Sequence, residues 1–197
     1  LARAGAHVVV NDRDAGAAAA VVTAIDAAGG TAVACDGDVT ESGFAERFVD
    51  LALERFGGVD VVVNNAGYPW DAVIQRTSDE QFERMLEVHL VAAFRVLRAA
   101  IRPIQAAART EAATGREVFR KVVNVSSLVA SSGNAGQAAY GSAKAGLEGL
   151  TRTLAKEWGR YRVNVNCVAF GLIETRLVVP AGAPEATLAV DGRTVGI

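Results

Sequence analysis

Tyr140 and Lys144 carry side chains that can do proton chemistry together, because they stand four positions apart in the stretch QAAYGSAKAG. In a helix, residues four apart share one face, so the phenol and the ammonium can converge on a small volume. A phenol titrates at about pH 10, and a positive charge beside it favours the phenolate. We therefore expect Lys144 to lower the pKa of Tyr140. The alternative is that Tyr140 packs and Lys144 is a solvated helix charge, and the pair alone does not decide.

The composition is that of an ordinary globular protein. The chain has 197 residues, 51% hydrophobic and 21% charged, so it can bury a core, and we expect a single domain over 1–197. The formal net charge is -2 and the Lys and Arg residues are scattered, which argues against nucleic-acid binding. No apolar run is long enough to span a bilayer, so we expect no membrane contact and a cytoplasmic protein.

The two cysteines, Cys35 and Cys167, fall in apparent strands and follow no spacing typical of metal ligands. We interpret both as reduced core thiols. No metal site is therefore expected.

Short β-branched runs alternate with longer amphipathic stretches, which is the pattern of a parallel sheet covered by helices. We predict the α/β class, with a doubly wound parallel sheet of the Rossmann type. The run VDVVVNN is apolar throughout, as expected of a strand buried on both faces. The predicted strands are 7–12, 31–35, 59–65, 121–127 and 162–169.

Helices are predicted between these strands. One is rich in alanine and ends at 29–30, a second runs from its N-cap Thr40 to about residue 57, and a later one covers 140–158. The longest is predicted over 78–109. Ser78 and Gln81 form a capping box at its start, Pro103 bends or ends it late, and a loop follows at 110–117.

Polar, acidic or small residues follow all five predicted strands. Ligands of open parallel sheets gather beyond the carboxyl ends of the strands, so these residues belong to one edge. Five such ends in register are what a dinucleotide crevice needs. The residues are Asp12, Asp38 and Val39, 64–67 (NNAG), Ser126 and Ser127, and 170–175 (FGLIET).

These motifs resemble those of the short-chain dehydrogenase/reductase family, and the chain is most similar to its 3-oxoacyl-[acyl-carrier-protein] reductase-like members. The matching marks are NNAG at 64–67, Ser127 thirteen residues before Tyr140, the Tyr-x-x-x-Lys element YGSAK, and GLIET at 171–175. They run in the family's order over nearly the whole chain. Each mark alone is weak, whereas the ordered set is specific.

The resemblance implies hydride transfer between a nicotinamide cofactor and a carbonyl or secondary alcohol, here expected to be a 3-oxoacyl or 3-hydroxyacyl thioester. Tyr140 would be the general acid of reduction and the base of oxidation. Lys144 would lower the pKa of Tyr140 and hold the nicotinamide ribose, and Ser127 would donate to the developing alkoxide. By alternation along the strand, Ser126 should point away from Ser127.

Asp12 is the residue from which we predict which cofactor is bound. An acidic side chain there would bond the adenosine ribose hydroxyls and repel a 2′-phosphate, which favours NAD over NADP. Arg13 could instead receive that phosphate, so NADP stays open. Asn64 is expected to tie strands together. The resemblance implies further cofactor contacts by Tyr140 and Lys144, and by Asp38, Val39, Asn65, Ala66, Gly67, Ile173 and Thr175.

The chain departs from the family's pattern in several places. The glycine-rich turn that binds the pyrophosphate is missing, so we expect the natural protein to be longer. We also expect the sheet to lack its first and last strands. The missing first strand would leave a gap in the sheet before the strand 59–65. His89 replaces the family's asparagine and joins the expected catalytic residues. It is either a proton shuttle or a helix histidine that packs and bonds locally. Phe170 replaces a proline. Asn134 and Gln137 either touch substrate or cap their loop.

Two functions stay open. One is the NAD(P)-dependent oxidoreductase, supported by Ser127, Tyr140 and Lys144. The other is a non-catalytic or truncated family member that acts as a binding or interaction protein, supported by the missing glycine turn and His89. A Thr-Gly-x-x-x-Gly-x-Gly stretch about a dozen residues before Leu1 would favour the enzyme. Sugar, steroid and acyl-thioester carbonyls are all compatible with the motifs.

The two longest predicted helices carry more apolar residues than one face can bury. In the family these helices pair across a two-fold axis, so we expect a homodimer or homotetramer. The alternative is that they cover only their own sheet. The residues concerned are Met85, Leu86, Phe94, Leu97, Leu147, Leu150 and Leu154.

Overall fold

The computed structural model of the chain describes residues 1–171, 173, 187–190 and 193–196. Its contacts divide the chain into two compact units. The first unit is Leu1–Asp60 with Phe94–Val118, and the second is Val61–Ala93 with Phe119–Ile197. The expectation of a single domain stays a prediction.

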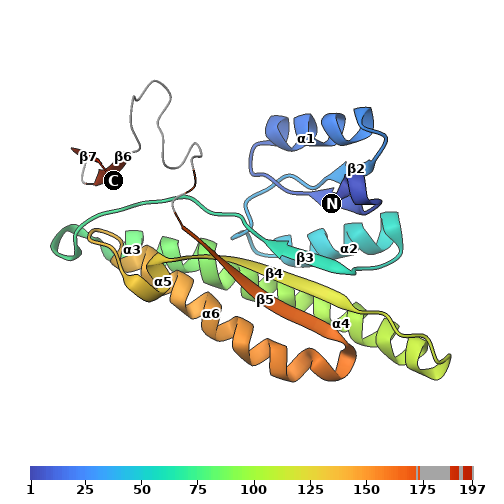
Figure 1. Cartoon of the computed structure of the whole chain (residues 1–197). Helices are drawn as coiled ribbons and strands as arrows, with labels where there is room; N and C mark the ends of the chain where they lie inside the picture. The colour runs from blue at the N-terminus through green and yellow to red at the C-terminus, as the bar shows by residue number, and fades with distance from the viewer. Residues whose placement is uncertain (172, 174–186, 191–192, 197) are drawn as a thin grey trace. The chain divides into compact units, whose positions relative to one another are not determined.

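The first unit contains a pair of parallel strands. β1 (His7–Val10) and β2 (Thr31–Ala34) are joined by α1 (Ala15–Ala27) and pair residue by residue over their whole length. Figure 1 shows α1 and α2 (Phe44–Phe56) on opposite sides of this pair, as in a doubly wound fold. The buried residues of the core include Ala18, Cys35, Phe44, Ala45 and Val49.

The two helices of the first unit begin in different ways. Asp14 caps α1, because its carboxylate accepts hydrogen bonds from the backbone N of Gly16 (2.8 Å) and Ala17 (3.2 Å). The prediction that Thr40 caps the next helix is wrong. α2 begins after Gly43, whose φ is 77°, and Thr40 donates its hydroxyl to the Asp38 carboxylate instead.

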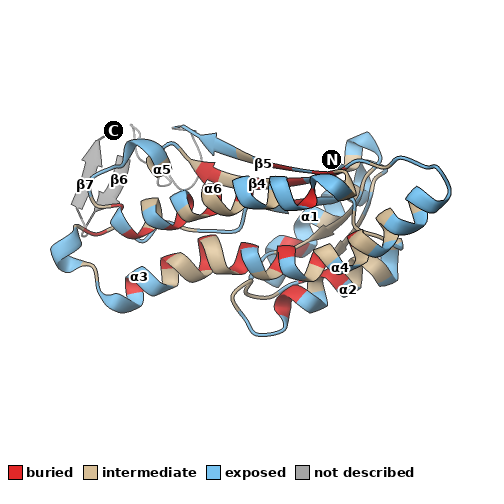
Figure 2. Ribbon diagram, turned by 90° about the horizontal axis from the view of Figure 1, so that it is seen from below, coloured by how far each residue is buried: buried red, intermediate tan, exposed pale blue. Residues whose placement is uncertain are grey.

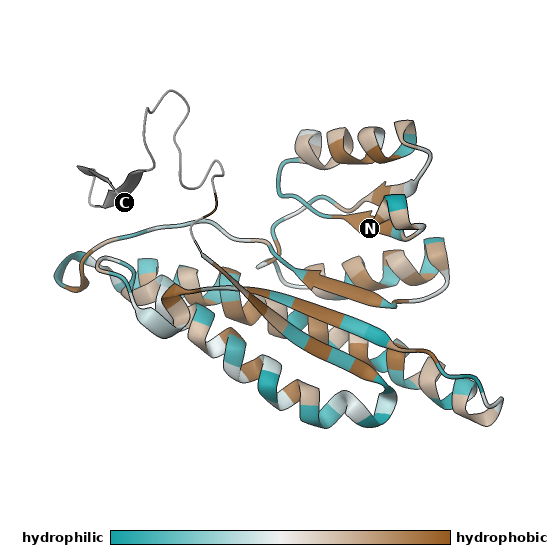
Figure 3. Ribbon diagram, viewed as in Figure 1, coloured by the Kyte–Doolittle hydropathy of each residue, from teal (hydrophilic) through white to brown (hydrophobic). Residues whose placement is uncertain are grey.

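The second unit is built on a three-stranded parallel sheet in the order β3-β4-β5. Its strands are β3 (Val61–Asn64), β4 (Arg120–Ser127) and β5 (Val163–Phe170), and α6 (Ala138–Trp158) packs along β4 and β5. Hydropathy alternates along β5 (Figure 3). Figure 2 shows buried positions recurring along α6, and these include Ala139, Ala143, Leu147 and Trp158.

The prediction that the third strand is buried on both faces is wrong. Val62 is 7% exposed, whereas Val61 and Val63 are 42% and 45% exposed. β3 is the edge strand of its sheet, and successive side chains point to opposite faces, so only the residue on the covered face is buried.

The strands fall into separate sheets. β1 and β2 form one sheet, and β3, β4 and β5 form another. β6 (Thr187–Val190) and β7 (Arg193–Gly196) form an antiparallel pair that the sequence did not lead us to expect.

Three successive segments replace the single long helix predicted over 78–109. α3 (Asp79–Leu86) leads into one π-helical turn (Glu87–Val91), and α4 (Ala92–Ala113) follows and continues through Pro103. A proline removes one backbone hydrogen bond, but α4 does not end there. The predicted loop that follows is correspondingly shorter.

The capping box at the start of α3 is half present. Ser78 Oγ accepts from the backbone N of Gln81 (3.1 Å), but Gln81 Nε2 donates to the carbonyl of Trp70 (2.7 Å) rather than returning to Ser78. Within the described residues, no helix is both long and apolar enough to cross a membrane. The remaining short elements are α5 (Val129–Ser132) and the 3-10 turns Ala2–Ala4, Ile74–Arg76 and Gly159–Tyr161.

Candidate active site

Ser127 and Tyr140 meet in the second unit. Ser127 is the last residue of β4 and Tyr140 lies in the first turn of α6, and the Ser127 side chain is close enough to the phenol to lower its pKa. Ser127 Oγ also accepts from the backbone N of Val129 (3.3 Å), which fixes its orientation. Ser126 points the other way, as alternation predicts, and its hydroxyl donates to Glu148 Oε1 of α6 (3.1 Å).

Lys144 lies one helical turn beyond Tyr140 on the same face. Its side chain is buried, with the residue 5% exposed, and its Nζ donates to the carbonyl of Val125 in β4 (2.7 Å). The same nitrogen lies 5.6 Å from the centroid of the Tyr140 ring. Burial lowers the pKa of Lys144 to about 8, against an opposing effect of Cys167. The ammonium therefore stays mostly charged at neutral pH.

The pKa of Tyr140 moves in the direction opposite to the one expected. Burial raises the pKa of the phenol, the hydrogen bond with Ser127 lowers it, and the charge of Asp71 raises it further, with a net upward shift. The ammonium of Lys144 donates to a main-chain carbonyl of β4, and burial is the largest cause of the shift of the phenol. In this structure Tyr140 is therefore a protonated phenol at neutral pH.

His89 packs against Tyr140 from the π-helical turn. The ring is 4% exposed and stands edge-on to the phenol ring, with the centroids 5.1 Å apart and the planes at 88°. Burial and then the charge of Lys144 lower the pKa of His89 to about 4, although the bond to Tyr68 opposes this. The neutral ring donates Nε2–H to the carbonyl of Tyr68 (3.0 Å). Its Nδ1 is buried with no partner in the described structure.

The loop after β3 passes directly over the His89 ring. A Cβ placed on Gly67 would lie 2.2 Å from Cε1 of His89, so the loop can pass there only because residue 67 has no side chain. Asn65, Ala66 and Gly67 are all exposed at the carboxyl end of β3. The stretch is thus open to a ligand on one side and closed by His89 on the other.

Asn64 holds the sheet together, as expected. Its Nδ2 donates to Asn124 Oδ1 of β4 (2.8 Å), and Asn124 Nδ2 donates to Thr151 Oγ1 of α6 (2.9 Å). Asn124 is fully buried and was not predicted to matter. This chain of side-chain hydrogen bonds connects β3, β4 and α6.

Asp71 is a charged neighbour of Tyr140 that the sequence did not single out. Its Oδ2 accepts from Gln137 Nε2 (2.8 Å), and Gln137 Oε1 accepts from Asn134 Nδ2 (3.1 Å). Asn134 and Gln137 thus bond within the protein, in agreement with the loop-capping alternative. The sequence around Asp71 contains no recognisable motif. Its role as a neighbour of Tyr140 is visible only in the structure, where two loops lie side by side.

The adenosine contacts expected in the first unit lie at the carboxyl ends of β1 and β2. Asp12 is exposed after β1, and its Oδ1 accepts from the backbone N of Asp14 (3.0 Å). Asp38 and Val39 follow β2 and are half-buried, and Asp38 Oδ1 accepts from the backbone N of Thr40 (2.9 Å). Since the strands are parallel, these residues share one edge of the pair.

The expected contacts after β5 are only partly described. Phe170 ends the strand and is 48% exposed, and Ile173 is 50% exposed. Thr175 lies outside the described residues. Cys35 is buried and Cys167 half-buried, and both are free thiols. Within the described part of the chain, no cluster of His, Cys, Asp and Glu side chains could hold a metal ion.

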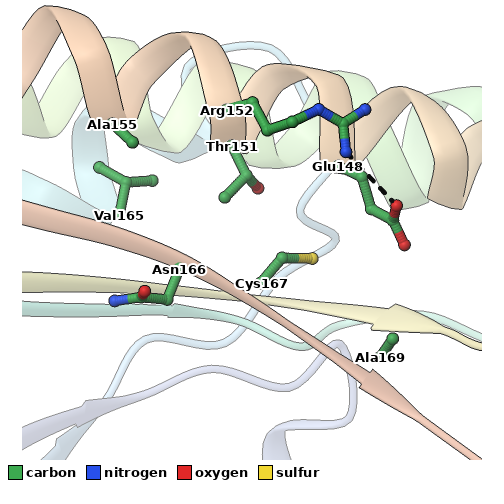
Figure 4. Close-up of a pocket in the computed structure, with 8 residues that line it drawn as sticks. All are labelled: Glu148, Thr151, Arg152, Ala155, Val165, Asn166, Cys167 and Ala169. Atoms are coloured by element: carbon green, nitrogen blue, oxygen red, sulfur yellow. Dashed lines mark ion pairs between the residues drawn. The ribbon is translucent and has the colours of Figure 1, made fainter.

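A cavity of about 380 Å³ lies between α6 and β5 (Figure 4). Its charged residues, Glu148 and Arg152, form an ion pair at 3.7 Å. Neither Ser127, Tyr140 nor Lys144 lines it. The cavity is therefore distinct from the candidate site.

The comparisons with known proteins agree with the motifs. Residues 1–186 match the family model described as short chain dehydrogenase. The chain is 35% identical over 176 residues to a 3-oxoacyl-[acyl-carrier-protein] reductase of Synechocystis sp., covering 89% of this chain and 67% of that protein. Across the curated relatives considered, the chain spans between 18% and 67% of their length.

Two solved structures show the same fold. A short chain dehydrogenase from Mycobacterium avium has a TM-score of 0.81 at 39% identity, over 92% of this chain and 64% of that one. An NAD+-bound xylitol dehydrogenase has a TM-score of 0.78 at 27% identity, over 86% of this chain and 62% of that one. Both likenesses extend over most of the residues described above.

Proposed function

Because the chain belongs to the short-chain dehydrogenase family, we propose that it is an oxidoreductase that transfers hydride between a nicotinamide cofactor and a carbonyl or secondary alcohol. The observation that carries the proposal is the meeting of Ser127, Tyr140 and Lys144 at the carboxyl end of β4. The substrate class that we propose is a 3-oxoacyl or 3-hydroxyacyl thioester, in line with the reductase named among its relatives.

Tyr140 gives its phenolic proton to the carbonyl oxygen during reduction. Its raised pKa keeps that proton in place at neutral pH, so the site favours reduction there. Ser127 accepts from the backbone N of Val129, which leaves its hydroxyl proton to be donated to a carbonyl oxygen lying beside the phenol. Lys144, with its ammonium buried, supplies the positive charge near the developing alkoxide.

The residues present would contact the two ends of a bound dinucleotide, the nicotinamide and the adenosine. The exposed backbone of Asn65, Ala66 and Gly67 and the ammonium of Lys144 would hold its nicotinamide end, which supplies or accepts the hydride when bound. Asp12 would bond the adenosine ribose in the first unit and oppose a 2′-phosphate, so we propose NAD rather than NADP. Asp38 and Val39 would contact the adenine.

His89 acts as a positioning residue in this proposal. A pKa of about 4 keeps the imidazole neutral, and its Nε2–H is committed to Tyr68, which argues against proton shuttling through the ring. The ring instead braces the edge of Tyr140 and supports the loop that carries Gly67.

Changing Tyr140→Phe tests the proposal in the full-length protein. We expect turnover of a 3-oxoacyl thioester with NADH to fall about a hundredfold to ten-thousandfold, because the proton donor is lost while the ring remains. Fluorescence titration should show nearly unchanged NADH affinity, and tighter binding of NADH than of NADPH in both proteins. Tyr161→Phe is the matched control and should keep full turnover. Unreduced turnover in Tyr140→Phe would rule out its catalytic role, and dinucleotide binding without any turnover in the unmodified protein would favour a non-catalytic binding protein.

A further inference from the structure

Asp71 is a half-buried carboxylate on the loop between β3 and α3 that no part of the proposed reaction uses. One of its oxygens, Oδ2, accepts from Gln137 Nε2 at 2.8 Å. The other, Oδ1, is buried without a hydrogen-bond partner among the described residues. Burying a carboxylate with one oxygen unpaired lowers the stability of the fold. We therefore ask what the charge and the position of Asp71 contribute.

The partner of Asp71 stands at the start of the helix that carries the reactive phenol. Gln137 is 8% exposed and immediately precedes α6, yet its side chain caps no N–H of that helix. Its amide is instead held at both ends, by Asp71 on the nitrogen and by Asn134 on the oxygen. The amide group of Gln137 thus has one fixed orientation.

The two loops are also joined through their main chains. The backbone N of Ala72 donates to the carbonyl of Gly136 (2.9 Å), and Ala72 pairs with Gln137 in an isolated parallel bridge. The carbonyl of Gln137 then accepts from the backbone N of Gly141 (2.7 Å), which is a bond of the first turn of α6. A path of short bonds therefore runs from Asp71 through Gln137 to the turn that contains Tyr140.

We propose that Asp71 is a positioning residue for Tyr140, which fixes the first turn of α6 through Gln137 and places a negative charge beside the phenol. The inference rests on the proposed function, because it gives Asp71 a role in the reaction assigned to Tyr140. The charge and the hydrogen bond are separable, since an asparagine at this position keeps an oxygen for Gln137 and loses the charge.

The charge of Asp71 acts on the phenol against the charge of Lys144. Among the described residues, the titratable groups around Tyr140 are His89 from the π-helical turn, Lys144 from α6 and Asp71 from the loop, and Ser127 of β4 is neutral. His89 is neutral at working pH, and burial is the largest cause of the raised Tyr140 pKa, to which the charge of Asp71 adds. A negative charge disfavours the phenolate, so Asp71 keeps Tyr140 in the form that donates a proton.

Asp71→Asn tests the charge without requiring turnover. The chain has three tyrosines, so subtracting the ultraviolet pH titration of Tyr140→Phe from that of the intact protein isolates the Tyr140 phenol. We expect the pKa of Tyr140 to fall in Asp71→Asn, and the alkaline limb of ketone reduction to move to lower pH with it. Asp26→Asn, an exposed change on α1, is the matched control and should leave both unchanged. An unmoved Tyr140 titration in Asp71→Asn would overturn the electrostatic role.

Asp71→Ala tests the geometry, because it removes the bond to Gln137 as well as the charge. We expect hydrogen exchange at the amide of Gly141 to speed up at least tenfold in Asp71→Ala and to stay unchanged in Asp71→Asn. The kcat should fall about tenfold to a hundredfold in Asp71→Ala, because a small misplacement of the reacting group is enough for such a loss. Gln137→Met breaks the same bond at similar volume and should give the same exchange result if Asp71→Ala does not fold.

Unchanged protection of Gly141 in both Asp71→Ala and Gln137→Met would refute the positioning role. Because the tyrosine titration and the exchange rates need no substrate, they stand even if the protein reduces no thioester. Failure of this inference is therefore distinguishable from failure of the proposed function.

Discussion

The buried imidazole of His89 makes the stability of the protein depend on pH. Its pKa is about 6.5 in an unfolded chain and about 4 in the folded one, because burial disfavours the charged ring. As the pH falls from 6.5 to 4, His89 becomes protonated in the unfolded state but stays neutral in the folded state, so the free energy of unfolding decreases. The full loss for this group is about 3 kcal/mol.

Urea denaturation at pH 7 and pH 4.5 measures this effect. In His89→Asn we expect a smaller decrease between the two pH values than in the unmodified protein, since the titrating ring is gone. The chain has two histidines, and the exposed one serves as the control: His7→Asn should keep the decrease. An equal decrease in His89→Asn and in the unmodified protein would contradict the assignment.

At the level of single residues, spacing predicted which side chains come together better than it predicted their environment. Tyr140 and Lys144 stand four apart, and Ser127 ends a strand, so their convergence follows from helix and strand periodicity. The direction of the Tyr140 pKa was wrong because burial, which dominates it, is a property of the packed fold. Asp71 was missed for a similar reason, since its partner Gln137 is brought to it by the pairing of two distant loops.

The π-helical turn and the loop after β3 depend on each other at one point. Gly67→Ala would place a methyl group 2.2 Å from Cε1 of His89, and overpacking of this kind costs about 1–3 kcal/mol. We expect that loss in the unmodified background and a much smaller one in a His89→Ala background, because the ring that blocks the methyl group is gone. A double-mutant cycle of unfolding free energies measures the coupling.

Gly149→Ala is the control for this cycle, because nothing lies within 4 Å of a Cβ added there on α6. It should be neutral or slightly stabilising, as alanine generally is in place of a helical glycine. Equal losses for Gly67→Ala in both backgrounds would show that backbone conformation at residue 67, rather than the ring of His89, sets the requirement for glycine.

At the level of elements, the periodic pattern predicted all five parallel strands and the helices between them, with ends that differ by a few residues. The sequence pattern did not predict the π-helical turn, whose buried residues are Val88 and His89. Pro103 was predicted to bend or end the helix, and it does not end it, since α4 continues past Pro103. The apolar run of β3 was misread because residue type does not show how many neighbouring strands and helices cover it.

At the level of the whole molecule, the exposed apolar residue of the longest helix favours self-association. Of the apolar residues expected in the interface, Met85, Leu97 and Leu147 are buried within the chain, whereas Phe94 is 43% exposed beneath the guanidinium of Arg98. We expect a homodimer or homotetramer by light scattering at micromolar concentration. Phe94→Asp should shift the mass towards the monomer, because a charge there opposes burial.

Phe119→Asp controls for a general effect of removing an exposed aromatic ring, because Phe119 is 52% exposed just before β4 and outside these helices. It should leave the mass unchanged. A monomeric mass for the unmodified full-length protein would refute the assembly.

The order in which the strands find their partners sets how this fold forms. β1 needs only α1 to be made before β2 arrives beside it, whereas β3 must wait until α3, the π-helical turn and the whole of α4 have been made. Longer loops cost more entropy to close, so the second pairing is the slower one. During synthesis β3 therefore spends an interval with its backbone N–H and C=O groups unpaired and Val62, which is buried in the folded chain, in water, and an unpaired apolar strand of this kind is prone to aggregate.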